Sequence, residues 1–304
     1  MRHLPSDIAN GKCSYPLYND PNFTATPDLS RVCELKNDDQ KEVLKFLAIR
    51  PVHTVVMSSF INDNGIENHL NRGKFYAYRN AEGKLEGVAL IGHTTLGEAP
   101  SDAALTALAA IARSAETPIH LIMSSGNTAL TFWNRFTNGF SEPRLTCTET
   151  LFELSFPFMV QDCKYEVRRA NPNELLQVAE AQAEVAFIEC GVDPMLKDRE
   201  GFLKRVARRI EQRRIFVVFE NGKLVFKADI ISETDEVIYL EGIYVAPEFR
   251  GKGIGSSCLA KLNLELLNRV QNICLLSNVE FTNAHHSFRK AGFKSTDQCT
   301  TIFV

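Results

Sequence analysis

The sequence predicts a protein of two α/β domains, each built from a similar succession of helices and strands. Its 304 residues are enough for two domains of ordinary size. Hydrophobic residues make up 44% of the chain and charged residues 23%, which is typical of a globular protein. Both halves repeat the order helix, hairpin, strand, helix, strand, short helix, strand. This repetition indicates two copies of one α/β fold.

The first copy, residues 31–160, follows a leader at 1–30 that is rich in proline and is expected to be irregular. Helical and strand-like spacing of apolar residues predicts its elements. Asn80-Ala81-Glu82-Gly83 is a hairpin signal, and Ser101 is a suitable helix N-cap. The expected elements are a helix at 38–49, strands at 74–79 and 85–92, a helix at 101–115, a strand at 118–123, a helix at 129–136 and a strand at 147–156.

The second copy, residues 161–304, shows the same patterns more strongly. Asn221-Gly222 is a tight-turn signal between two apolar runs, and Gly292 is a suitable helix C-cap. The expected elements are a strand at 165–169, helices at 173–188 and 198–214, strands at 215–220, 224–231 and 237–245, a helix at 256–270, a strand at 272–277, a helix at 284–290 and a strand at 300–304.

Charge and cysteine content exclude several classes of function. The net charge of −3 gives no reason to expect binding to nucleic acid or to an anionic membrane. The eight cysteines form no Cys-x-x-Cys pair, so the usual signal of a zinc or redox-dithiol site is missing. No apolar run reaches the roughly 18 residues of a membrane helix, and the first residues lack the apolar core of a signal peptide. We therefore expect a cytoplasmic protein with reduced thiols.

The stretch Arg250-Gly251-Lys252-Gly253-Ile254-Gly255-Ser256 is the most informative motif. It lies between an expected strand, which ends at Val245, and an apolar helix. Glycines allow close backbone approach, and the free N–H groups of a first helical turn attract anions. The order strand, glycine-rich loop, helix therefore predicts a phosphate-binding site.

Several phosphate loops could explain the motif. A Walker A loop requires Ser or Thr after its lysine, whereas Gly253 follows Lys252 here. A dinucleotide-binding loop in a nicotinamide-dependent enzyme requires its first glycine directly after the strand, but Pro247 to Arg250 intervene. A connector without any ligand is a further alternative. The spacing Arg-x-x-Gly-x-Gly, set by Arg250, Gly253 and Gly255, fits a third kind of loop.

Together with Tyr244-Val245-x-Pro247-Glu248-Phe249, this spacing resembles the acyl-coenzyme A loop of the GCN5-related N-acetyltransferase (GNAT) family. The resemblance covers roughly residues 162–304. The first half resembles a degenerate copy of the same fold, as in tandem members of the family, with Thr94 to Pro100 in place of the loop. The resemblance implies an α/β fold with two GNAT-like domains, each a mixed, mostly antiparallel central sheet flanked by helices.

The resemblance also implies a cosubstrate, acetyl-coenzyme A, and no metal. Carried over by position, the loop from Arg250 to Ser256 would hold the coenzyme A pyrophosphate. The strand end Ile243-Tyr244-Val245 would pair with the pantetheine arm and could polarise the thioester carbonyl. A lysine-like acceptor amine, with a pKa of about 10.4, needs a base. Glu241 is the candidate, because strand alternation places it on one face with Ile243 and Val245.

One family feature is missing. Members often carry a tyrosine, in a helix that ends before Gly-Phe, which protonates the leaving thiolate. Ala284, Gly292 and Phe293 match this pattern, but Phe288 takes the position of the tyrosine. Either water or another side chain (Tyr239, Tyr244 or His286) replaces the acid, or the thiolate leaves unprotonated. A further alternative is that the domain binds acyl-coenzyme A without efficient transfer.

The resemblance therefore predicts an N-acetyltransferase that moves an acetyl group from acetyl-coenzyme A to a primary amine of a small molecule or to a lysine side chain. The alternative function is a non-catalytic, regulatory module that binds acyl-coenzyme A. The expected partner is the acceptor amine, with no nucleic acid or membrane, and a homodimer is compatible with the sequence. The first half would shape the acceptor cleft or brace the catalytic half.

Overall fold

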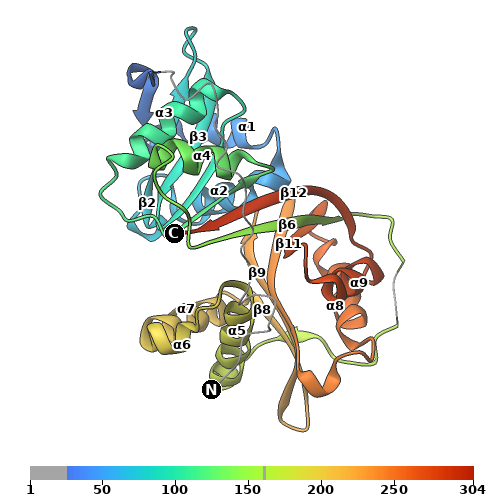
Figure 1. The fold of residues 1–304 in the computed structure, drawn as a ribbon. Helices are drawn as coiled ribbons and strands as arrows, with labels where there is room; N and C mark the ends of the chain where they lie inside the picture. The colour runs from blue at the N-terminus through green and yellow to red at the C-terminus, as the bar shows by residue number, and fades with distance from the viewer. Residues whose placement is uncertain (1–25, 160–161) are drawn as a thin grey trace.

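The two halves of the chain share one continuous β-sheet (Figure 1). The computed structural model describes residues 26–159 and 162–304, so most of the predicted leader at 1–30 lies outside the described residues. Within these ranges, twelve strands follow the order β1-β2-β3-β4-β5-β12-β6-β11-β10-β9-β8-β7. Only β4 with β5 and β10 with β11 pair in parallel. The predicted mixed, mostly antiparallel sheet with flanking helices is thereby confirmed.

The first half contains β1 to β6 and α1 to α4 (blue to green in Figure 1). The elements are β1 (Val32–Glu34), α1 (Gln40–Leu47), α2 (Pro51–Asn64), β2 (Gly73–Arg79), β3 (Leu85–Gly92), β4 (Thr94–Glu98), α3 (Asp102–Arg113), β5 (Leu121–Ser125), α4 (Thr128–Thr137) and β6 (Leu145–Leu154). Short 3-10 helices occupy Leu29–Arg31, Asn37–Asp39 and His69–Asn71.

The second half contains the remaining strands and helices, with 3-10 turns at Pro172–Glu174 and Pro247–Phe249. The elements are β7 (Arg168–Arg169), α5 (Leu175–Cys190), α6 (Pro194–Lys197), α7 (Arg199–Glu211), β8 (Ile215–Glu220), β9 (Lys223–Glu233), β10 (Val237–Val245), α8 (Ile254–Leu266), β11 (Asn272–Asn278), α9 (Thr282–Lys290) and β12 (Lys294–Phe303).

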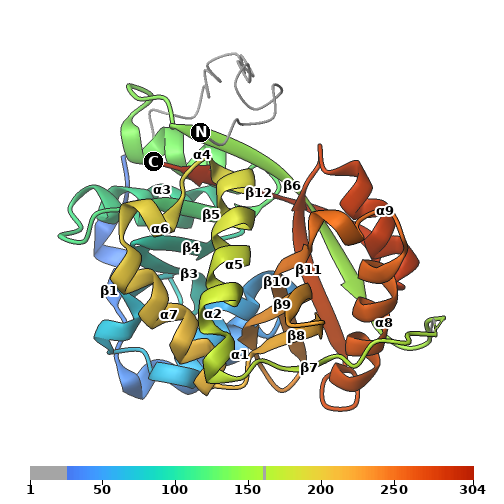
Figure 2. The ribbon, with the colours of Figure 1, turned by 90° about the horizontal axis from the view of Figure 1, so that it is seen from below.

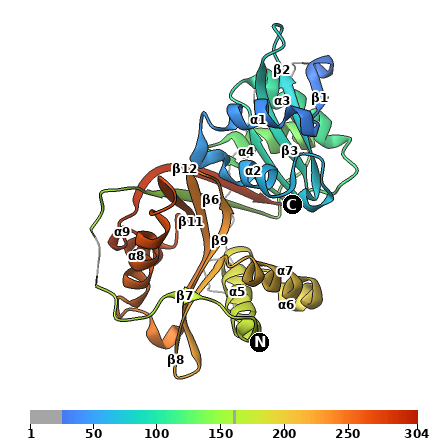
Figure 3. The ribbon, with the colours of Figure 1, turned by 180° about the vertical axis from the view of Figure 1, so that it is seen from behind.

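The halves are joined by an exchange of their last strands. Strand β6, from the first half, pairs with β11 of the second half on one side and with β12 on the other. Strand β12, from the second half, pairs in turn with β5 of the first half. The two strands run side by side between the halves in Figures 1 and 3. The predicted boundary between 31–160 and 161–304 stays a prediction, because each half completes its part of the sheet with a strand of the other.

Helices cover both faces of the sheet in each half. In the second half, α8 and α9 cover one face and α5 to α7 the other, as Figure 2 shows from below. In the first half, α3 and α4 lie on one face, and α1 and α2 on the other. Helix α2 also contacts β9 and β10 of the second half. A small apolar cluster around Val55, Leu151 and Tyr239 fills this junction.

Most of the predicted elements are present, and the differences have physical causes. The Asn221-Gly222 turn is confirmed, with φ of 50° and 75° at its two residues, the left-handed values that a tight hairpin requires. Helix α2 was not predicted, because its β-branched residues disfavour helix and its buried positions lie on more than one face, which hides the helical period. Strand β4 occupies Thr94–Glu98, a stretch expected at the place of the loop.

Candidate active site

A gap opens between the parallel strands β10 and β11. Their pairing runs from Val237 with Asn272 to Leu240 with Leu275. Strand β10 then continues to Val245, while β11 continues to Asn278 beside β6 alone. In the described structure, the backbone edge of β10 from Glu241 to Val245 therefore faces no strand on this side. The residues predicted to bind pantetheine (Ile243, Tyr244 and Val245) lie along this half-buried edge.

A bulge in β10 shapes the gap. The pairing of β10 with β9 shifts register between Glu241 and Tyr244, and Gly242 has a φ of 59°. A β-carbon on Gly242 would lie 2.4 Å from Gln182 Oε1 and 2.7 Å from Lys227 Nζ, so only glycine fits there. The Lys227 ammonium donates to the Gly242 carbonyl oxygen at 3.1 Å. The bulge is thus held from below by a buried side chain.

Lys227 itself is balanced by a buried carboxylate. Its Nζ lies 2.7 Å from Asp229 Oδ1, and the two side chains are 0% and 1% exposed. Burial lowers the pKa of Lys227, and the negative charge of Asp229 opposes this shift. Removal of Asp229 would leave the buried Lys227 ammonium without its carboxylate partner, whereas Asp229 also has Arg209 Nη1 at 3.6 Å from its Oδ2. The pair therefore fixes the backbone next to Glu241.

The predicted phosphate loop leaves the start of α8 free for an anion. Gly251 and Gly253 have φ of 75° and 76°, a backbone region that favours glycine. Gly253 is the N-cap of α8 and provides no side-chain cap. The first backbone bond of the helix runs from Ser257 N–H to the Gly253 carbonyl at 3.1 Å, so the N–H groups of Ile254 to Ser256 have no partner within the helix. This end of α8 can bind an anion.

Close packing of α8 against β10 explains a further glycine of the motif. A β-carbon on Gly255 would lie 2.8 Å from Val245 Cγ2. The two charged side chains of the loop are turned back onto the protein. Arg250 donates to the Val245 carbonyl at 2.8 Å and to Glu184 at 3.1 Å, and Lys252 donates to the Glu248 carbonyl at 2.8 Å. Both cations therefore brace the loop and leave its backbone N–H groups accessible.

Glu241, the predicted base, lies exposed at the start of the gap. Tyr239 precedes it on the same face of β10, and the Tyr239 hydroxyl donates a hydrogen bond of 2.7 Å to Glu241 Oε1. Burial and the neighbouring carboxylates raise the pKa of Tyr239 well above its usual value, so it remains a hydrogen-bond donor at neutral pH. This bond fixes the orientation of the Glu241 carboxylate.

Two further glutamates, which sequence reasoning missed, lie close enough to interact with Glu241. Burial, followed by the negative charge of Glu241, raises the pKa of Glu149 to about 7, while a hydrogen bond from the Thr301 hydroxyl opposes the shift. Reduced hydration and the charges of Glu241 and Glu149 raise the pKa of Glu189 to about 8. Glu189 is exposed at the surface, so water screens part of this repulsion. Glu149 stands on β6 and Glu189 near the end of α5, so only the tertiary fold brings them to Glu241.

Phe288, at the position where a tyrosine was expected, lies in the hydrophobic core. Phe288 is 7% exposed and packs edge-to-face on Phe152 and Phe293. His285 is buried one turn earlier on α9, and its Nε2 has no hydrogen-bond partner in the described structure. Burial lowers the pKa of His285, so the ring is neutral at neutral pH and does not replace the acid.

The other side chains considered as acids are placed differently. Tyr239 is bonded to Glu241, and the Tyr244 hydroxyl lies 3.4 Å from Glu184. His286 is exposed on α9.

Within residues 26–159 and 162–304, no group of three or more His, Cys, Asp or Glu side chains could hold a metal ion. No helix of the same residues is long and apolar enough to cross a membrane.

Comparison with known proteins is consistent with this geometry. A family model described as "Acetyltransferase (GNAT) domain" matches residues 211–295, which include β10, the loop, α8 and α9. No curated protein matches the chain.

Solved structures extend the likeness to both halves. An acetyltransferase of the GNAT family from Colwellia psychrerythraea superimposes with a TM-score of 0.57 at 12% identity, covering 90% of this chain and 98% of that one. A Drosophila protein gives a TM-score of 0.65 at 12% identity, with 90% and 98% covered. A tandem GNAT protein from the clavulanic acid biosynthesis pathway gives 0.55 at 12% identity, with 90% and 97% covered. Residues 211–295 therefore carry a GNAT domain, and the chain as a whole has the fold of solved GNAT proteins, a tandem one among them.

Proposed function

We propose that the C-terminal half transfers an acetyl group from acetyl-coenzyme A to a primary amine, either of a small molecule or of a lysine side chain. The observation that carries this proposal is the arrangement along β10. An oriented carboxylate, Glu241, lies at one end of an unpaired strand edge, and a helix N-terminus without a side-chain cap lies at the other. Acetyl-coenzyme A is a long molecule with the thioester at one end and phosphates nearer the other. Transfer from it needs a base near the thioester and an anion site for the phosphates.

The loop and the strand edge fit the coenzyme. The N–H groups of Gly251 to Ser256 would hold the pyrophosphate, because those of Ile254 to Ser256 have no partner within α8, and Gly251 and Gly253 have no side chain to obstruct the approach. The backbone of Ile243 to Val245 would hydrogen-bond the pantetheine arm in the gap. A backbone N–H of this edge would stabilise charge on the thioester oxygen during transfer. No metal is needed for these steps.

The three carboxylates of Glu149, Glu189 and Glu241 would bind and deprotonate the acceptor amine. Glu241 would accept a proton from the acceptor ammonium, directly or through water, while Tyr239 holds the carboxylate in place. Glu149 and Glu189 would attract the cation, since each lies close enough to Glu241 for its charge to be felt there. The neutral amine would then attack the thioester carbon, the C–S bond would break, and the second proton of the amine nitrogen would pass to water as the amide forms.

The leaving sulfur needs no strong acid. A thiol has a pKa of about 8.5, so it can depart as thiolate near neutral pH and take a proton from water. Phe288 at the tyrosine position is compatible with this route, because its buried ring contributes no proton. Transfer would then be slower than in a member that protonates the thiolate directly.

The test is release of coenzyme A thiol from acetyl-coenzyme A, measured with a panel of small amines and lysine peptides. The acceptor product is confirmed by mass spectrometry, and coenzyme affinity is measured by calorimetry. We expect amine-dependent thiol release above the blank. Failure to bind coenzyme A at millimolar concentration would rule out the proposal.

A second function is favoured by one observation, the phenylalanine at position 288. Without the usual acid, the domain could serve as a regulatory module that binds acyl-coenzyme A and does not transfer the acyl group. The same experiment separates the two functions. Tight coenzyme binding without thiol release from any amine would support the regulatory module.

A further inference from the structure

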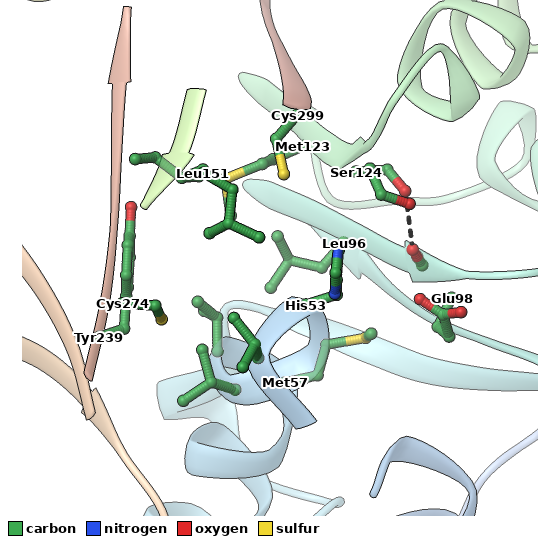
Figure 4. Close-up of a pocket in the computed structure, with 16 residues that line it drawn as sticks. His53, Met57, Leu96, Glu98, Met123, Ser124, Leu151, Tyr239, Cys274 and Cys299 are labelled. Carbon is green, nitrogen blue, oxygen red and sulfur yellow. Dashed lines mark hydrogen bonds between the residues drawn. The ribbon is translucent and has the colours of Figure 1, made fainter. Parts of the chain in front are cut away.

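A small cavity lies at the junction of the two halves (Figure 4). Its volume is about 40 Å³, room for a group of a few heavy atoms. Helix α2 forms one wall. The others are formed by six strands that are consecutive in the sheet: β4, β5, β12, β6, β11 and β10. The apolar side chains that line it include Val55, Val56, Leu96, Met123, Leu151 and Leu276.

The cavity lies next to the proposed base along two strands. Tyr239 lines the cavity, and Glu241 follows two residues later on the same face of β10. Leu151 also lines it, and Glu149 lies two residues away on the same face of β6. Two residues of a strand span about 6–7 Å. A substituent of four or five atoms spans this distance.

The polar side chains that line the cavity already have partners. Arg50 donates to both carboxylate oxygens of Glu98, at 3.1 and 3.2 Å, and to the Ser125 hydroxyl at 3.2 Å. Ser124 donates to the Gly97 carbonyl at 3.0 Å, as Figure 4 shows, and His53 Nε2 lies 2.8 Å from Asp297. None of the buried polar atoms that lack a partner in the described residues lines this space. Burial raises the pKa of Cys299 to about 12 and that of Cys274 well above its usual value, so both thiols are neutral. A charged or strongly polar occupant would lose its hydration without compensation here.

We propose that this cavity receives the apolar substituent of the acceptor. The acceptor is then a small primary monoamine with a short aliphatic or thioether group, and a polyamine or a hydroxylated amine is a poor substrate. This inference rests on the proposed acetyl transfer. It divides the acceptor site in two: the carboxylates Glu149, Glu189 and Glu241 bind the ammonium group, and the junction of the two halves selects the other end.

The experiment compares amines of equal length in the thiol-release assay. We pair n-butylamine with 3-aminopropanol and n-pentylamine with putrescine, and measure kcat/KM for each. Each CH₂ group buried in the cavity raises kcat/KM roughly 4-fold, so an apolar amine should exceed its polar partner by about 10-fold or more. Equal values within each pair would overturn the inference and leave the acetyl transfer standing. Absence of thiol release from every amine would instead overturn the proposed function.

Two variants of the cavity wall and one control locate the effect. Val56→Phe fills the cavity and should abolish the preference for n-pentylamine. Val56→Thr keeps the volume, adds a hydroxyl group, and should reduce the preference several-fold without loss of folding. Ile49→Phe adds the same ring at a position that is 74% exposed, and should change nothing. A preference that survives both changes at Val56, in variants with wild-type melting temperature, contradicts the assignment.

Discussion

Each half contains a pair of parallel strands that separate after a few residues. The gap between the strands is bridged by side chains in the first half and is open in the second. In the first half, β4 and β5 pair only from Thr94 to Leu96 and then separate, as β10 and β11 do after Leu240. The gap in the first half is bridged by side chains. Ser124 donates across it to the Gly97 carbonyl at 3.0 Å, and Arg50 joins Glu98 to Ser125 at 3.1 and 3.2 Å. The corresponding gap in the second half has no bridge among the described side-chain contacts.

The helices that follow these strands differ in the same way. Helix α3 begins after a short link, residues 99–101, and Ser101 accepts a hydrogen bond from the Ala104 N–H at 3.2 Å. Helix α8 begins after the longer link 246–253, and its N-cap is Gly253, which has no side chain. A helix start that is capped from within cannot use the same N–H groups for a ligand. One fold therefore supports either a braced wall or an anion site, according to a few side chains.

The largest expected effect tests whether the chemistry belongs to the second gap. Glu241→Gln should lower kcat by about 100-fold or more, because the amine loses its base, while coenzyme A affinity stays the same. The measurements are steady-state thiol release and calorimetry. Glu82→Gln, at an exposed hairpin turn of the first half, is the control and should keep wild-type turnover. Unchanged turnover of Glu241→Gln across the pH range would remove Glu241 from the mechanism.

The pH dependence of stability should also come from the second gap. The raised pKa values of Glu149 and Glu189 mean that the folded state binds their protons more tightly than the unfolded chain, whose value is about 4.5. This contribution to stability is fully present below pH 4.5 and is lost as the pH rises through 7 to 8. After allowance for solvent screening, we expect a loss of about 2 kcal/mol.

Urea unfolding at a series of pH values measures this effect. Glu149→Gln should flatten the decline between pH 5 and pH 8, because the amide binds no proton in either state. Parallel curves for the wild type and the variant would show that Glu149 is not held protonated by its surroundings.

The glycines beside the two gaps should respond unequally to the same change. Gly255→Ala places a β-carbon 2.8 Å from Val245 Cγ2 and should displace α8 from β10. We expect coenzyme A affinity to fall about 10-fold, a change of about 1.4 kcal/mol. Gly97→Ala meets no atom within 4 Å and should leave affinity intact. Calorimetric titration of both variants would detect the difference, and equal affinities would argue against binding at the start of α8.

The smallest expected effect concerns the bridge in the first half. Arg50→Ala removes the contacts with Glu98, Ser125 and Asp297, and should lower the free energy of unfolding by about 1 kcal/mol. Coenzyme A affinity should not change, because the described contacts of Arg50 involve neither the loop before α8 nor the edge of β10. Thermal unfolding and calorimetry of the same sample are sufficient. A change in affinity of this variant would mean that the two gaps are coupled.

Local patterns in the sequence predicted much of the fold and part of the site. The apolar run of β10, the turn at Asn221-Gly222 and the glycine loop depend on neighbouring residues alone. The roles of Glu241 and of the loop stay predictions. Helix α2 was not predicted, because it packs against both halves and its polar and apolar residues do not separate onto two faces.

The parts that could not be predicted depend on contacts between distant residues. Alternation along β6 indicates a strand, but it does not say that the strand pairs with β11. Only that pairing carries Glu149 to the second gap, more than ninety residues from Glu241 in the chain. The junction cavity likewise combines side chains of both halves, so no single stretch of sequence marks it.

The exchange of β6 and β12 has a consequence for synthesis on the ribosome. Strand β12 begins at Lys294, so it is made after every other strand of the sheet, yet β5 of the first half depends on it. Until β12 has been synthesised, the edges of β5 and β6 that it will cover have unpaired backbone groups. Such edges are prone to pair with other chains. The pairing of β12 with β5 also spans more than 170 residues, a separation that slows folding. The arrangement that unites the halves thus leaves strand edges of the first half unpaired until β12 has been made.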